Sequence, residues 1–144
     1  MNHRDILALA RRIEAPTPVG TQVWHVWNEG AGRPLILLHG GSGSWTHWVK
    51  NVDHLGQHKQ VWALDIPGFG DSDLPPSAKD ADDLVPYVAE IFAHTFGTQA
   101  VDVMGFSFGG MLAGLIAAHQ PSRFRKLILV GVPGLGLFGK ELPM

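Results

Sequence analysis

Short apolar runs that stop at glycine recur along this chain, and they constrain its fold more than any other feature. Residues 34–41 read PLILLHGG, residues 100–105 read AVDVMG and residues 125–132 read RKLILVGV. A continuous apolar run of this length is typical of a strand that is buried on both faces. Residues 21–30, TQVWHVWNEG, alternate like a half-buried strand, and residues 60–73 begin with another short strand that runs into a Pro/Gly loop.

Helical patterns fill the intervals between these runs. Residues 44–58 place apolar side chains at helical spacing, with a serine at the N-cap position. Residues 82–97 form a second pattern that stops at a glycine, and we expect regular helix to begin near Pro86 because proline is tolerated only in the first turn. A third pattern covers residues 108–120. This alternation predicts an α/β fold, a mostly parallel sheet with helices on both faces.

The composition excludes several classes of function. An apolar content of 45% with 17% charged residues is typical of globular proteins. The net charge of −2 gives no electrostatic reason to expect nucleic acid or an anionic membrane as a partner. The absence of cysteine excludes disulfides and cysteine nucleophiles, and the histidines are too scattered to suggest a metal site. Residues 1–16 lack the apolar region of a secretory signal, so we expect a cytoplasmic protein that has no membrane partner.

The stretch GFSFG at residues 105–109 stands between an apolar strand and a helical pattern. In that context G-x-S-x-G is the pattern of a nucleophile elbow. The turn is so tight that side chains two residues before and after the serine would clash, which explains Gly105 and Gly109. The strained serine is pushed out at the carboxyl edge of the sheet, near the positive end of the following helix. We therefore predict that Ser107 is a catalytic nucleophile; the alternative is a glycine-rich turn with an incidental serine.

A second glycine-rich loop follows the buried strand at residues 34–41, in the stretch LLHGGSGSW at 37–45. Acyl transfer needs preorganised N–H groups that point at the developing oxyanion. We predict that the backbone N–H groups of Gly41 and Phe108 form this oxyanion hole. An ordinary turn or a phosphate cradle are the alternatives, although a P-loop is excluded because no G-K-[ST] follows.

Asp65 ends a predicted strand in LDIPGFGDSD at residues 64–73. A carboxylate at the end of a strand suits a catalytic role. Aspartates also brace Pro/Gly loops by accepting hydrogen bonds from backbone amides, and we favour this structural role for Asp65 and Asp71.

The stretch GLGLFG at residues 134–139 has the spacing of a dinucleotide-binding motif. A site of that kind also needs a helix that begins at the glycines and an acidic residue about 20 positions further on. Pro133 precedes the motif and the sequence ends at Met144. We therefore interpret it as an apolar loop and expect no cofactor, with a dinucleotide-binding domain as the alternative.

The HGGSG, DIPGFGDSD and GFSFGG stretches, in this order on alternating strands and helices, resemble the α/β-hydrolase superfamily. The resemblance covers residues 20–136 and implies the first half of such an enzyme. Residues 1–144 would be the N-terminal part of one core domain, truncated after the sixth strand, without a cap domain or the C-terminal strands. The resemblance also implies that His39 is structural and holds the oxyanion loop. It disfavours the dehalogenase and epoxide-hydrolase branches, which place aspartate where Ser107 stands.

The resemblance implies a catalytic acid and a histidine later in the chain than the serine. After Ser107 the only acidic residue is Glu141 and the only histidine is His119. Twelve helical residues place His119 about 18 Å from Ser107 along the helix axis. His39 and His47 are upstream alternatives for the base, because a triad is defined by geometry and not by order. The histidines that we expect to be solvated on the surface are His25, His54, His58 and His94.

We therefore expect a serine-dependent hydrolase of a small-molecule carbonyl substrate, most simply a carboxylic ester, that acts through an acyl-enzyme. The acid and the histidine would come from a C-terminal portion or another chain, so these 144 residues alone are expected to be inactive or weakly active. A carbon–carbon bond hydrolase is an alternative, because HGGSGSW and GLGLFG are similar to that branch. A non-catalytic, partner-binding domain is another, because the last strand leaves an apolar edge that a C-terminal half or a second copy would cover.

Overall fold

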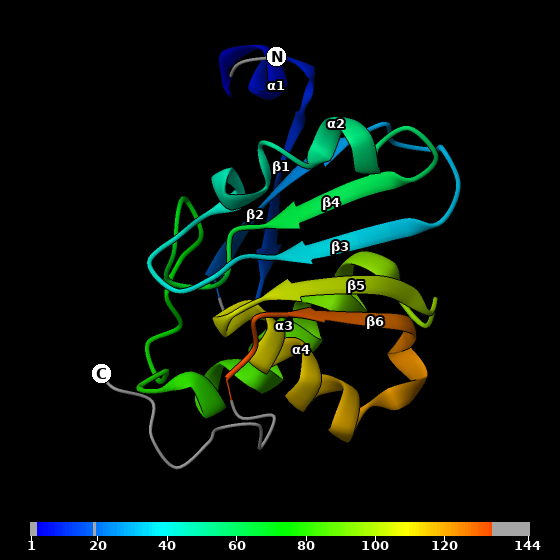
Figure 1. Cartoon of the computed structure of the whole chain (residues 1–144). Helices are drawn as coiled ribbons and strands as arrows, with labels where there is room; N and C mark the ends of the chain where they lie inside the picture. Colours follow the sequence, from blue (N-terminus) through cyan, green and yellow to red (C-terminus); the bar gives the residue numbers. More distant parts are fainter. Residues whose placement is uncertain (1–2, 19, 134–144) are drawn as a thin grey trace, which may run out of the picture.

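A computed structural model describes residues 3–18 and 20–133, and at its centre lies one six-stranded sheet with the order β1-β2-β4-β3-β5-β6 (Figure 1). The strands are β1 (Arg11–Thr17), β2 (Gly20–Trp27), β3 (Pro34–Leu38), β4 (Gln60–Leu64), β5 (Val101–Phe106) and β6 (Phe124–Val130). β3 pairs in parallel with β4 and β5, and β5 with β6, whereas β1 and β2 are antiparallel to their neighbours. The predicted α/β fold is therefore confirmed.

The register of the central strands brings three loops together. All five residues of β3 are buried, as its continuous apolar run predicts. Leu38, the last residue of β3, stands opposite Leu64 on β4 and opposite Gly105 on β5. The carboxyl ends of these parallel strands therefore lie side by side, and the loops that follow them meet at one edge of the sheet.

Helices cover both faces of the sheet (Figure 1). α3 (Ala81–Phe96) and α4 (Phe108–His119) pack on one face, where Phe92 and Ile116 join Ile36 in the larger core cluster. α1 (His3–Leu9), the 3-10 helix η1 (Trp45–Trp48) and α2 (Val52–Leu55) lie on the other face, and η2 (Pro121–Arg123) precedes β6. In the described part of the chain, no helix combines the length and the apolar character needed to cross a membrane.

Residues 44–58 do not form the single helix that their spacing predicts. They form η1 and α2, two short pieces separated by a turn. Ser44 is the N-cap of η1 as predicted, because its side chain accepts a hydrogen bond from the Thr46 N–H. The Trp45 N–H donates to the Asp65 carboxylate at 2.9 Å, which fixes the start of η1 against a neighbouring loop. Such tertiary contacts outweigh the local helical periodicity.

α3 begins at Ala81, five residues before Pro86, so the predicted start near Pro86 is wrong. Asp80 is the N-cap, and its side chain accepts a hydrogen bond from the Asp83 N–H at 3.0 Å, while the Asp83 side chain accepts from the Asp80 N–H. This capping box stabilises the first turn of α3. The helix therefore tolerates the loss of the one backbone hydrogen bond that Pro86 cannot donate. Gly97, with a φ of +60°, is the C-cap, as the pattern predicts.

The amino-terminal hairpin of β1 and β2 differs most from the expectation. The sequence patterns do not predict α1 or β1, yet β1 pairs with β2 along its whole length. In β1 the exposed Arg12 and Glu14 alternate with Ile13 and Ala15, which pack against the larger core cluster. β2 is expected to be half-buried, but its last six residues are all buried because elements cover both of its faces.

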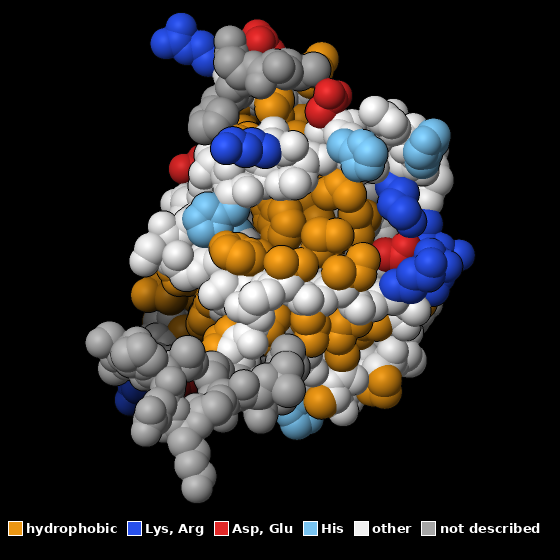
Figure 2. Space-filling model, viewed as in Figure 1, with side chains coloured by type: hydrophobic (Ala, Val, Ile, Leu, Met, Phe, Trp, Pro, Cys, Tyr) orange, Lys and Arg blue, Asp and Glu red, His pale blue; other side chains and the backbone are white. Residues whose placement is uncertain are grey.

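One part of the sheet surface remains apolar and uncovered in the described structure. Phe106 at the end of β5 and Ile128 and Val130 on β6 are 40%, 42% and 42% exposed. They lie on the face that η1 and α2 cover elsewhere, beside the half-buried Met104. Figure 2 shows hydrophobic side chains gathered in the middle of this view, with Lys and Arg side chains beside them.

Candidate active site

Ser107 lies in the turn between β5, which ends at Phe106, and α4, which begins at Phe108. Its φ of 52° and ψ of −117° lie in a region that residues other than glycine rarely adopt. The Ser107 N–H donates to the Val130 carbonyl at 2.9 Å, and the Ser107 carbonyl accepts from the Met111 N–H at 3.0 Å. These bonds fix the strained backbone on both sides. Ser107 is half-buried, and its side chain makes no capping hydrogen bond to α4.

Glycines on both sides of the serine let β5, α4 and β3 approach one another. A Cβ on Gly105 would lie 2.4 Å from the Cα of Gly110. A Cβ on Gly109 would lie 2.3 Å from the Leu38 carbonyl oxygen and 2.4 Å from that of His39. Backbone atoms cannot move aside as a flexible side chain can, so this turn geometry admits no larger residue at either position.

Gly41 and Phe108 meet beside this turn from two different loops. A Cβ on Gly41 would lie 3.8 Å from the Cβ of Phe108, which places the two residues in contact. Phe108 is the first residue of α4, so its N–H has no acceptor within the helix. The Phe108 N–H therefore lies at the positive end of α4, and Gly41 lies beside this residue.

His39 holds the start of the HGGSG loop (residues 39–43). Its ring is fully buried, and Nε2 accepts a hydrogen bond from the Ile66 N–H at 3.0 Å. The proton therefore sits on Nδ1, which donates to the Gly40 carbonyl at 2.7 Å. Burial lowers the pKa of His39 and so favours the neutral ring that these two bonds require. Both nitrogens are occupied, and in this state the ring has no lone pair with which to accept a proton from Ser107.

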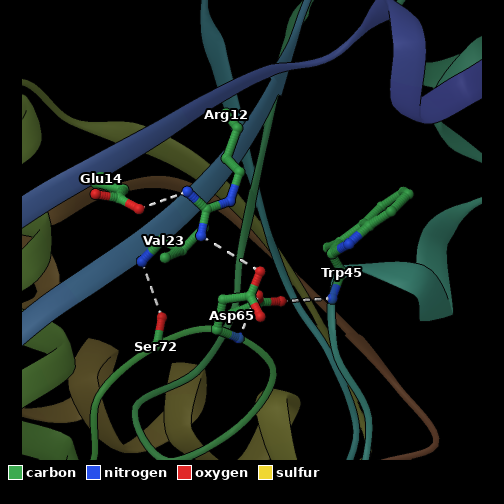
Figure 3. Close-up of polar contacts among 7 residues, drawn as sticks. Arg12, Glu14, Val23, Trp45, Asp65 and Ser72 are labelled. Carbon is green, nitrogen blue, oxygen red and sulfur yellow. Dashed lines mark hydrogen bonds and ion pairs between the residues drawn. The ribbon is translucent and has the colours of Figure 1, made fainter.

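Asp65 joins the loop that follows β4 (the β4 loop, residues 65–73) to η1. The carboxylate is 1% exposed; Oδ1 accepts from the Trp45 N–H at 2.9 Å and Oδ2 from the Asp71 N–H at 3.0 Å (Figure 3). Asp71 does not brace the loop with its carboxylate, contrary to the prediction. It contributes its N–H, and its side chain pairs with the Arg12 guanidinium at 3.3 Å because strand β1 lies beside the loop.

The geometry of a strand, a strained serine and a helix between two glycine-rich loops agrees with a comparison with known families. The family model of the alpha/beta hydrolase fold matches residues 33–140. The chain belongs to the α/β-hydrolase family.

Several known α/β hydrolases are similar to this chain. The soluble epoxide hydrolase of Corynebacterium sp. (strain C12) is 32% identical over 121 residues, which cover 83% of this chain and 42% of that protein. The 2-hydroxy-6-oxo-2,4-heptadienoate hydrolase of Pseudomonas putida is 34% identical over 110 residues, which cover 74% of this chain and 40% of that protein. The crystal structure of naproxen esterase from Bacillus subtilis shares the fold, with a TM-score of 0.75 at 22% identity over 87% of this chain and 45% of that one. This α/β hydrolase chain thus spans about two fifths of the length of the curated relatives it matches.

The other candidate bases of this α/β hydrolase chain lie in different places. His119 is the last residue of α4, so the whole helix separates it from Ser107. His47 is on η1, and its Nδ1 accepts a hydrogen bond from the Gly40 N–H at 3.1 Å. The structure therefore brings both upstream histidines, His39 and His47, to Gly40, where each holds the backbone of the HGGSG loop.

The prediction that His25 is a solvated surface group is wrong. It lies on β2 and is 2% exposed, and its ring stacks on that of Trp45 with 4.8 Å between the centroids. The Trp27 ring is also close, with 6.3 Å between its centroid and that of His25, and it lies 5.6 Å from the Trp45 ring. The sequence pattern assigns this face of β2 to solvent, whereas η1 covers it. The other three histidines of that group, His54, His58 and His94, are exposed as predicted.

Burial lowers the pKa of His25, so the unfolded chain binds a proton that the folded chain does not as the pH falls through about 6.5. This contribution to stability is present above that pH and is lost below it. We expect His25→Phe, which keeps an aromatic ring against Trp45, to lose less of its free energy of unfolding than the wild type between about pH 7.5 and 5.5. Urea titrations followed by tryptophan fluorescence measure the two losses. His54→Gln, at an exposed position, should behave like the wild type; equal losses in all three proteins would contradict the prediction.

Sequence reasoning missed the contacts that anchor the β4 loop to the amino-terminal hairpin. The Arg12 guanidinium bridges Glu14 and Asp71, and the Ser72 hydroxyl accepts from the Val23 N–H at 2.9 Å (Figure 3). The partners of the last bond are 49 residues apart in the chain, so no local pattern links them. The period of two in β1 is the one signal that could have placed this strand beside the loop.

Asp102 is a buried carboxylate near the opposite, amino-terminal end of β5. Its side chain is 3% exposed and pairs with Arg125 at 2.8 Å and with Lys59 at 3.0 Å. Burial alone would raise the pKa of Asp102, but the hydrogen bonds from Arg125 and Lys59 outweigh burial and lower it. Asp102 therefore carries a stabilising ion cluster at the far end of the strand from Ser107.

The remaining observations concern a metal ion, a cofactor and the catalytic acid. Among the residues that the structure describes, no group of three or more His, Asp or Glu side chains could hold a metal ion. The GLGLFG stretch at 134–139 and Glu141 both lie outside the described residues.

Proposed function

We propose that this chain carries the nucleophile and the oxyanion hole of a hydrolase that cleaves a small-molecule carboxylic ester. The observation that supports the proposal most directly is the strained turn at Ser107, with the amides of Phe108 and Gly41 beside it. Strain of this kind persists only where the surrounding structure imposes it, and it is concentrated at functional sites. A serine, and not an aspartate, at this position argues against the epoxide-opening chemistry named for one of the relatives.

In the proposed reaction the Ser107 Oγ attacks the carbonyl carbon of the ester. The carbonyl oxygen becomes an oxyanion that accepts hydrogen bonds from the N–H groups of Gly41 and Phe108. The C–O bond then breaks, the alcohol leaves with a proton, and water hydrolyses the acyl-enzyme to the carboxylic acid. The histidine that moves these protons, and the acid that orients it, come in this proposal from a C-terminal portion or from another chain, because His39 and His47 are bound to the loop and His119 lies at the far end of α4.

A fluorophosphonate probe tests the nucleophile directly, because it forms a covalent bond with an activated serine. We expect the 144-residue chain to label slowly by itself, since in this proposal its base comes from elsewhere, and faster when imidazole is added as an external base. Ser107→Ala should abolish the imidazole-dependent adduct seen by intact mass. Ser122→Ala, at an exposed serine on η2, is the matched control and should label like the wild type. An adduct that survives Ser107→Ala refutes the nucleophile, and rapid labelling without imidazole shows that the base lies within this chain.

A carbon–carbon bond hydrolase is the second candidate, and the similarity to the heptadienoate hydrolase of Pseudomonas putida favours it. The same serine and amides would serve, but the leaving group would be a carbon that must accept a proton. Mass spectrometry after incubation with an activated ester and with a vinylogous 1,5-diketone separates the two: the ester proposal predicts an acyl adduct on Ser107 from the ester alone.

A non-catalytic, partner-binding role is the third candidate, and the uncovered apolar surface of Phe106, Ile128 and Val130 favours it. A C-terminal half or a second copy of the chain would cover this surface, since monomeric proteins rarely leave a large apolar patch exposed. This role predicts self-association in sedimentation velocity together with no Ser107-dependent labelling under any condition.

A further inference from the structure

Two imidazole rings hold the glycine that precedes the proposed oxyanion donor. The Gly40 N–H donates to Nδ1 of His47 at 3.1 Å, and the Gly40 carbonyl accepts from Nδ1 of His39 at 2.7 Å. The first bond fixes the peptide between residues 39 and 40. The second fixes the peptide between Gly40 and Gly41, whose N–H is the proposed donor to the oxyanion. In a trans peptide the N–H and the C=O point in opposite directions, so the two bonds together set the direction of the Gly41 N–H.

His47 is an exposed residue, but its ring lies against the HGGSG loop and the end of β5. A Cβ on Gly43 would lie within 2.2–2.7 Å of three atoms of the His47 ring, so the loop lies flat against the ring and needs glycine there. Phe106 is one residue before Ser107, and the centroid of its ring lies 5.9 Å from the centroid of the His47 ring. A Cβ on Gly40 would also meet this Phe106 ring at 3.1 Å. His47 therefore links the HGGSG loop to the strand that carries the nucleophile.

The bond from Gly40 specifies one form of the His47 ring. Because Nδ1 accepts the hydrogen bond, its lone pair is engaged, and the neutral ring carries its proton on Nε2. A ring in this form cannot take the proton of Ser107 through Nδ1. We propose that His47 is a positioning residue, not a base: as a neutral, Nε2-protonated acceptor it orients the backbone of Gly40 and, through it, the Gly41 amide. This inference rests on the proposed function only where it assigns Gly41 to the oxyanion hole.

Two substitutions of His47 distinguish the effect of its hydrogen-bond acceptor from the effect of its planar ring. In His47→Asn the Oδ1 atom takes the place of Nδ1 and can accept the Gly40 N–H, whereas His47→Phe keeps the planar ring and removes the acceptor. We expect Gly40 amide hydrogen exchange in His47→Phe to be faster by about fivefold or more, the effect of losing one neutral hydrogen bond, and exchange in His47→Asn to stay near the wild-type rate. Imidazole-assisted labelling of Ser107 should fall in His47→Phe and be restored in His47→Asn. A role in packing alone would predict the opposite order, because phenylalanine fills the space better than asparagine.

The wild-type protein provides a test that does not depend on any variant. Nitrogen-15 NMR of the histidine rings should show that the neutral form of His47 carries its proton on Nε2 and not on Nδ1. Protonation on Nδ1, or unchanged Gly40 exchange in a folded His47→Phe protein, overturns the inference. If Gly40 exchange responds as expected but the wild type never labels at Ser107, the proposed function fails and the hydrogen bond from Gly40 to His47 stands.

Discussion

Gly109→Ala should lower the free energy of unfolding by about 3 kcal/mol or more, because the new methyl group would overlap backbone and not a movable side chain. Its Cβ would lie 2.3 Å from the Leu38 carbonyl oxygen and 2.4 Å from that of His39. To relieve this overlap α4 must move away from β3, which also separates the Phe108 amide from the Gly41 amide. Urea titration followed by tryptophan fluorescence measures the loss.

The same helix offers a matched control for this substitution. Gly114 lies in the middle of α4, and a Cβ on it would meet no atom within 4 Å. Gly114→Ala should therefore raise the free energy of unfolding by about 0.5–1 kcal/mol, through the lower conformational entropy of alanine in the unfolded chain. An increase in the free energy of unfolding for both variants would show that α4 does not lie against β3 at Gly109.

Asp65→Ala should lower the free energy of unfolding by about 3 kcal/mol, because it leaves two backbone N–H groups without their charged acceptor. The Trp45 N–H and the Asp71 N–H both donate to this carboxylate, which is 1% exposed. Asp65→Asn should show an intermediate loss, since an amide oxygen can accept one of the two bonds while the NH₂ group faces the other donor. The same urea titrations rank the three proteins.

Asp53→Ala is the control for Asp65, because Asp53 is an exposed carboxylate on α2. It should change the free energy of unfolding by no more than about 0.5 kcal/mol. A loss for Asp65→Ala as small as this would mean that the bonds to Trp45 and Asp71 add little to the stability of the β4 loop.

The parts of the fold that follow from the sequence are those that depend on neighbouring residues. The buried run of β3, the glycine that ends α3 and the order of strand, serine and helix at Ser107 are all local patterns, and they predict the α/β fold and the nucleophile turn. The position of η1 is not local, because its first residue, Trp45, is held by a bond to Asp65, 20 residues away. β1 escaped prediction for a similar reason: its weak alternation has meaning only once β2 pairs with it.

The candidate site also contains residues that local patterns predict and residues whose state depends on distant contacts. Ser107, Gly41 and Phe108 could be named from short motifs, since the chemistry of a nucleophile elbow and an oxyanion loop requires these residue types at fixed spacing. The burial of His25 and the hydrogen bond that His47 accepts from Gly40 could not be predicted, because an isolated histidine has no pattern that tells a buried or hydrogen-bonded ring from a solvated one. Only the positions of η1 over β2 and beside the HGGSG loop decide the state of these two rings.

The anchoring of the β4 loop also has a consequence for how the protein folds. The bonds from Ser72 to Val23 and from Asp71 to Arg12 join residues that are 49 and 59 positions apart, and contacts of such long sequence separation form late because a large loop must close first. We therefore expect the β4 loop, and the Asp65 carboxylate within it, to reach their final shape only after the amino-terminal hairpin has docked on the sheet. Damage to β1 would thus slow or prevent maturation of the site near Ser107 without altering any residue in it.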